Sequence, residues 1–96
     1  MENEKATERY LRNEIKAIGG EAYKFVSPGV SGVPDRIVCL PDGKAVFVEV
    51  KSEGKKSTQR QKQQQDKLRS LGFEVYVDID TRQKVDELVR RLKDEI

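Results

Sequence analysis

The sequence predicts an α/β fold in which helices flank a mixed central sheet. Three observations lead to this prediction. Apolar residues recur at helical spacing near both ends of the chain, β-branched and apolar runs lie between, and short stretches rich in Gly or Pro separate them. In chain order the segments are α-β-β-β-α-β-α. The 96 residues fit one domain, spanning residues 1–96.

Three helices are expected, over about residues 2–18, 58–71 and 81–95. A glycine pair ends the first, Ser57 or Thr58 can cap the second, and another glycine follows the second. The last helix carries an amphipathic stripe at the spacing i, i+3, i+4 and i+7, formed by Val85, Leu88, Val89 and Leu92. This stripe predicts a face that either covers the sheet or pairs with a second copy.

Strands are expected over residues 22–26 and 73–78, and a β-hairpin over 35–51. The hairpin reverses at the sequence Pro-Asp-Gly-Lys, whose first three residues favour tight turns. Folding it about this turn places Asp35 opposite Glu49 and Val50. Since side chains alternate along a strand, Glu49 and Lys51 share the face of Ala45 and Phe47, and the valines take the other face.

Composition restricts the chemistry. The chain has no histidine and one cysteine, Cys39, which excludes imidazole catalysis, disulfide frameworks and cysteine-based zinc sites. Oxygen ligands remain, and these suit Mg²⁺ or Mn²⁺. The net charge of +2 predicts that any phosphate-binding surface is local. No signal-peptide pattern or membrane-length apolar run occurs, so we expect a cytoplasmic protein without a membrane partner.

Asp35, Glu49 and Lys51 form a candidate site for phosphodiester hydrolysis. Two carboxylates, with the backbone carbonyl of Val50, can hold a divalent cation, and Lys51 can orient water or offset charge near a phosphate. The alternative is ordinary surface charge, because Pro-Asp is common at strand starts. The apolar neighbours of Glu49 indicate an interior strand, where an unpaired charge is costly. The residues alone therefore leave the metal site and ordinary surface charge as equal alternatives.

Other charged residues are less certain candidates. Helical angle alone does not choose a third acid among Glu4, Glu8 and Glu14 of the first helix. Four basic residues are candidates for contact with a DNA backbone, although solvated surface charge is the simpler interpretation. They are Lys24, Arg36, Lys55 and Lys56. The glutamine-rich run 59–65 is typical of a solvated helix face.

Several motifs together resemble the virus-type replication-repair nuclease (VRR-NUC) family of the PD-(D/E)xK nuclease superfamily. They are Gly-Gly-Glu-Ala-Tyr-Lys-Phe from residue 19, Ser-Pro-Gly from 27, Ser-Gly-Val-Pro-Asp-Arg from 31 and Phe-Val-Glu-Val-Lys from 47. The superfamily motif alone is short and unspecific. The last two runs together are much more specific.

The resemblance implies a restriction-endonuclease-like core that uses Mg²⁺ or Mn²⁺. Asp35 and Glu49 would be metal ligands, Lys51 the catalytic lysine, Glu8 the helix-1 glutamate and Gln61 the glutamine after the catalytic strand. Ser31 of the third motif joins the candidate DNA contacts.

Small stand-alone members look like phage or bacterial proteins and resemble homodimeric Holliday-junction resolvases. A homodimer would place two active sites about a two-fold axis for symmetric cutting of branched DNA. The alternatives are a flap, nicking or exonucleolytic enzyme of the same fold, or a DNA-binding subunit without activity.

Overall fold

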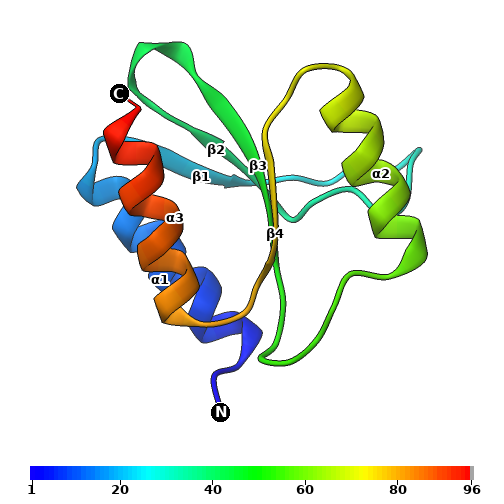
Figure 1. The fold of residues 1–96 in the computed structure, drawn as a ribbon, viewed down its shortest axis with the longest axis horizontal. Coiled ribbons are helices and arrows are strands. Elements are labelled where there is room, and N and C mark those ends of the chain that lie inside the picture. The colour runs from blue at the N-terminus through cyan, green and yellow to red at the C-terminus, as the bar shows by residue number, and fades with distance from the viewer. Residues whose placement is uncertain (96) are drawn as a thin grey trace.

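A computed structural model describes residues 1–95 and contains the predicted elements in the predicted order (Figure 1). The helices are α1 (Glu4–Ala17), α2 (Gln59–Ser70) and α3 (Arg82–Asp94), and the strands are β1 (Glu21–Lys24), β2 (Arg36–Cys39), β3 (Ala45–Val50) and β4 (Val75–Ile79). Within the described part of the chain, no helix has the length and apolar character needed to span a bilayer.

The sheet is mixed, as predicted, with the strand order β1-β2-β3-β4. The first three strands pair antiparallel, whereas β3 and β4 pair parallel. The chain reaches β4 through α2, which is the kind of crossover that a parallel pair requires. Figure 1 shows α1 and α3 side by side on one side of the sheet and α2 on the other.

The core lies between the sheet and the pair α1 and α3. The predicted valine face of β3 is buried there against apolar residues of both helices. The stripe of α3 belongs to this core: Val85, Leu88 and Leu92 are buried and Val89 packs against them. Of the two roles expected for that stripe, covering the sheet is the one the structure shows.

The other face of the sheet is only partly covered. Phe47 contacts Phe25 and Phe73 there, with ring centroids 5.6 and 5.3 Å away. Tyr23 and Phe73 remain 58% and 44% exposed. In α2 the only buried residue is Gln65. This helix therefore covers its face of the sheet less completely than α1 and α3 cover the opposite face.

Two local features differ from regular geometry. The hairpin turn is a 3-10 turn over Pro41–Gly43 in which Asp42 has φ 71°. β4 starts two residues later than expected and contains a bulge, since Val48 pairs with Tyr76 but Val50 pairs with Ile79. Asp78 lies in the bulge with φ 55°. The simple alternation expected for residues 73–78 is therefore wrong at its end.

Candidate active site

Asp35 directly precedes β2 and is tied to β3. The hairpin register pairs Arg36 with Val48, which brings Asp35 beside Glu49 and Val50 as predicted. A carboxylate oxygen of Asp35 accepts a hydrogen bond from the backbone N–H of Val50 at 2.6 Å. In an extended strand the N–H and C=O of one residue point to the same side. The Val50 carbonyl therefore faces the side on which Asp35 lies.

Glu49 is buried inside the sheet with one unpaired oxygen. Its residue is 1% exposed, and its Oε1 has no hydrogen-bond partner among the described residues. Burial, followed by the nearby Asp35 carboxylate, raises the pKa of Glu49 to about 8, while Lys51 opposes the rise. A buried acceptor without a donor is rare in native proteins and calls for an explanation such as an absent ion.

Lys51 lies at the end of β3 and contacts the first turn of α2. Its Nζ donates a hydrogen bond to Oε1 of Gln61 at 2.6 Å. The same oxygen accepts from the backbone N–H of Thr58 at 2.8 Å, and Oγ1 of Thr58 accepts from the backbone N–H of Gln61 at 3.2 Å. Gln61 and Thr58 thus form a capping box, and the box holds Lys51 beside the carboxylates.

The donor set fits a hard divalent cation. Two carboxylates and one carbonyl converge from the hairpin, and one carboxylate oxygen is buried without a partner. Within residues 1–95, no three acidic, histidine or cysteine side chains gather closely enough to hold an ion by themselves. Water and substrate oxygens would therefore complete the coordination, as is common for Mg²⁺.

The three glutamates of α1 lie in different surroundings. The pKa of Glu4 is raised, first by burial and then by the charges of Asp35 and Glu8, whereas Lys51 lowers it. Glu4 in turn contributes to the raised pKa of Glu49. Glu8 instead forms an ion pair with Arg36 at 3.7 Å. Glu14 lies near Tyr10, whose hydroxyl donates a hydrogen bond to Asp86 of α3 at 2.6 Å.

Of these glutamates, Glu4 is therefore the one that lies near both Asp35 and Glu49. The role expected of Glu8 stays a prediction. Helical spacing places Glu4 one turn before Glu8 on the same stripe, so the sequence offered both residues but no means to rank them by distance.

The candidate DNA contacts fall into two groups. Lys24, Ser31, Lys55 and Lys56 are exposed to solvent. Arg36 is half-buried, and besides its ion pair with Glu8 it donates to the carbonyl of Ala22 at 3.3 Å. Arg36 is therefore engaged in an ion pair, which differs from the solvated surface charge expected of it.

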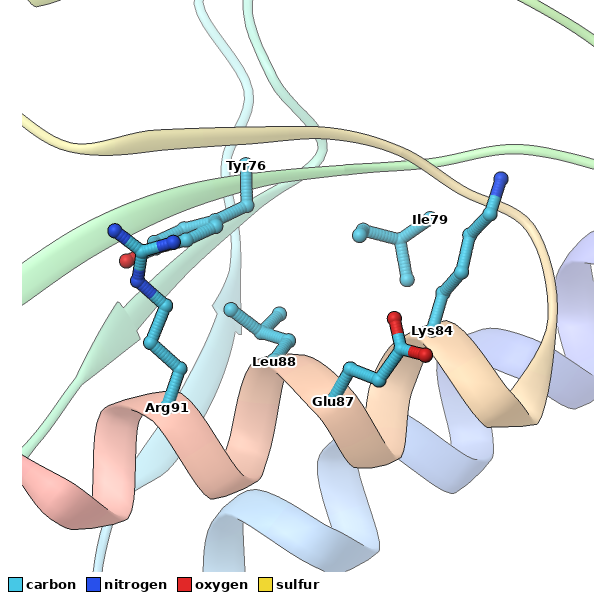
Figure 2. A pocket seen from close by; sticks show the side chains of 6 residues that line it. All are labelled: Tyr76, Ile79, Lys84, Glu87, Leu88 and Arg91. Atoms are coloured by element: carbon cyan, nitrogen blue, oxygen red, sulfur yellow. The ribbon is translucent and has the colours of Figure 1, made fainter.

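A groove between β4 and α3 lies apart from this cluster (Figure 2). It has a volume of about 330 Å³, and Arg91 stacks over the ring of Tyr76 at 5.8 Å from its centroid. Neither Asp35 nor Glu49 lines it. The candidate active site at the end of the hairpin is therefore separate from this groove.

The loop before Asp35 packs closely against α2 at Gly32. Gly32 has φ 84°, and a Cβ added there would lie 2.9 Å from the backbone oxygen of Arg60. Beside it, Nε of Arg60 donates to Oγ of Ser31 at 3.1 Å. These contacts join the segment that carries Asp35 to the helix turn that carries Gln61.

Gly32→Ala is expected to destabilise the protein by about 1–3 kcal/mol, because alanine is strained in this backbone region and its Cβ would push the loop away from Arg60. Gly29→Ala is the matched control, since that glycine has open space around it and no positive φ. Thermal unfolding measures the difference. Equal melting temperatures for the two variants would contradict this seating of the loop.

Comparison with known proteins places this arrangement in one nuclease class. The family model of the VRR-NUC domain matches residues 2–78, and the chain belongs to this family. The match contains Asp35, Glu49, Lys51 and Gln61, whereas α3 lies beyond it.

Two relatives agree with this membership. The "Putative nuclease p44" of Acyrthosiphon pisum secondary endosymbiont phage 1 is 51% identical over 74 residues, which is 77% of this chain and 80% of that protein. A solved structure described as a VRR_NUC domain is similar with a TM-score of 0.84 and 32% identity, covering 94% of this chain and 97% of that one. The similarity confirms the predicted family and α/β architecture.

Proposed function

We propose that this nuclease-family protein is a Mg²⁺- or Mn²⁺-dependent DNA endonuclease that selects branched DNA, with Holliday junctions as its main substrate. The observation that carries the proposal is the buried Glu49, with an unpaired oxygen, beside Asp35 and Lys51. In a bacterium or a phage-infected cell, such an enzyme would meet its DNA in the cytoplasm.

The roles of the residues follow from their positions. Asp35, Glu49 and the Val50 carbonyl would hold the cation, which when bound supplies activated water and polarises the scissile phosphate. Lys51 places a positive charge at the end of β3, where it offsets negative charge that builds on the phosphate. Gln61 accepts a hydrogen bond from Lys51 and limits the directions in which its ammonium group can point.

Exposed cations provide contacts outside this centre. Lys55 and Lys56 lie in the loop between β3 and α2, which leads away from Lys51. Lys24 ends β1 on the solvent side. Contacts of this kind bind phosphates without reading bases, so preference for branched DNA would come from shape and deformability.

A homodimer is part of the proposal because two symmetric cuts require two centres related by a two-fold axis. The apolar stripe of α3 is used inside its own core and does not serve as the interface. Analytical ultracentrifugation across a range of protein concentrations, with and without a four-way junction, determines whether the active species is a dimer.

The deciding experiment compares labelled four-way junctions, flaps, nicked duplexes and linear duplexes, with Mg²⁺, Mn²⁺ or EDTA. We expect paired incisions near the branch point of the junction, only with a cation, and none with Lys51→Ala. Cleavage restricted to flaps or to ends would instead favour the other enzymatic alternatives. Tight junction binding without cleavage under any of these cations would favour an inactive DNA-binding subunit.

A further inference from the structure

The bulge of β4 carries an aspartate that reaches the start of α2. Oδ1 of Asp78 accepts two hydrogen bonds from Ser57, from the backbone N–H and from Oγ, each at 2.9 Å. Ser57 is the residue immediately before the N-cap Thr58. Asp78 therefore fixes the position at which the chain enters the helix.

Ser57 is also held from inside the helix. Nε2 of Gln65 donates to Oγ of Ser57 at 2.8 Å, and Gln65 is 3% exposed. Gln65 is the single buried residue of α2. A helix with so little apolar contact depends on such polar bonds for its placement, and buried bonds of this kind are costly to leave unmade.

The backbone of Asp78 has an uncommon conformation. A non-glycine residue with φ 55° is uncommon and carries a conformational cost. The extra residue in β4 turns the Asp78 side chain toward Ser57. Bulges near active sites often redirect a side chain in this way.

The chain of contacts ends at the proposed catalytic lysine. From Asp78 it runs to Ser57, then through the Thr58 cap to Gln61, and from Gln61 to Nζ of Lys51. Every step is a hydrogen bond or a direct chain neighbour. The loop 52–56 between Lys51 and Ser57 has its own anchor, a hydrogen bond of 2.8 Å from the Gly54 N–H to Asp80, whereas the contacts from Asp78 act at the helix start itself.

We propose that Asp78 is a positioning residue that acts through Ser57 and the Thr58–Gln61 capping box to hold Lys51 at the proposed cleavage site. The inference rests on the proposed function for its catalytic consequence. Its structural part, the link from Asp78 to the start of α2, stands independently.

Two substitutions at this position separate the side-chain acceptor from the backbone. Asp78→Gly tolerates the positive φ but has no acceptor, whereas Asp78→Asn keeps an Oδ1 and is the residue type that best tolerates this conformation after glycine. Ser57→Ala removes the hydroxyl of the same contact. Ser70→Ala is its matched control, because the Ser70 hydroxyl bonds only within the far end of α2.

Amide hydrogen exchange on the metal-free protein tests the structural link. We expect Asp78→Gly to accelerate exchange at Thr58 by about tenfold, corresponding to one hydrogen bond of ordinary strength, with amides of α3 unchanged. Asp78→Asn should leave Thr58 protected. Unchanged protection at Thr58 in Asp78→Gly would overturn the inference.

Cleavage kinetics test the catalytic consequence. Asp78→Gly should lower kcat about tenfold with little change in KM, and Asp78→Asn and Ser70→Ala should remain near wild type. In a Gln61→Ala background the Asp78→Gly change should lower kcat less than twofold further, because the link is already broken. If the effects of Asp78→Gly and Gln61→Ala on kcat were fully additive, or if Asp78→Gly changed KM alone, the positioning role would be overturned.

These two measurements distinguish failure of this inference from failure of the proposed function. If the wild-type protein cleaves none of the DNA substrates, the proposed function fails, yet exchange at Thr58 still decides whether Asp78 holds the helix start. If the wild-type protein cleaves and Thr58 exchange does not respond, the inference alone fails.

Discussion

Glu49→Gln is expected to raise the thermal stability of the metal-free protein and to abolish its stabilisation by divalent cations. Glu49 is buried with an unpaired oxygen and lies against Asp35. Glutamine has nearly the same shape and no charge, so the repulsion disappears. The gain should be about 2 kcal/mol near pH 6 and larger at pH 8, because each pH step above 4.5 is worth about 1.4 kcal/mol while the folded protein keeps the Glu49 proton. In a domain of this length, each kcal/mol shifts Tm by about 4–8 °C.

The pH dependence follows from the direction of the pKa shift. Glu49 has a pKa of about 8 in the folded protein, against an ordinary value of 4.5. Between these values the folded state binds more protons than the unfolded state, so this group makes stability fall as pH rises. The stability gained by Glu49→Gln should therefore be small below pH 4.5, increase between pH 4.5 and 8, and be complete above pH 8.

Differential scanning calorimetry at several pH values, with EDTA or Mn²⁺, checks both parts. Wild-type Tm should rise with Mn²⁺ because the ion binds only the folded state, and Glu49→Gln should not respond. Glu87→Gln, at an exposed position of α3, is the control for removing one negative charge. A Tm at pH 8 that is lower for Glu49→Gln than for wild type would contradict the strain assigned to Glu49.

The hairpin could be predicted from the sequence because its information is local. The turn residues place the reversal at Pro41–Gly43, and the register that follows pairs Arg36 with Val48 and brings Asp35 to Val50. The apolar neighbours of Glu49 likewise predicted an interior strand, which its burial confirms. Contacts between residues close in sequence on paired strands leave few alternatives.

The remaining parts depend on packing between distant segments, which no local pattern encodes. Gln61 was singled out by family resemblance, although Thr58-Gln-Arg-Gln61 also fits the capping-box pattern that the structure shows. The burial of Gln65 could not be predicted, because this residue lies in the same glutamine-rich run. The bulge at Asp78 was missed because residues 73–78 alternate as a regular strand would.

Asp35→Asn is expected to reduce cleavage by more than a hundredfold while keeping most of the stability. Substitutions beyond the direct ligands of a metal already cost about 10–100-fold, and Asp35 is proposed as a direct ligand. Asparagine retains an oxygen that can accept the hydrogen bond from the Val50 N–H, but it has lost the negative charge that the cation requires. Junction cleavage in Mg²⁺ and in Mn²⁺ measures the first effect.

Asp35→Ala should differ from Asp35→Asn in stability, although both lose cleavage. Alanine leaves the Val50 N–H inside the sheet without its acceptor, at a cost of about 1–3 kcal/mol. Urea unfolding of the two variants and the wild type in EDTA separates this structural role from the metal-binding one. If Asp35→Ala were as stable as Asp35→Asn, the bond from Val50 to Asp35 would contribute nothing to the end of β3. If either variant cut junctions at the wild-type rate, Asp35 would not be a ligand.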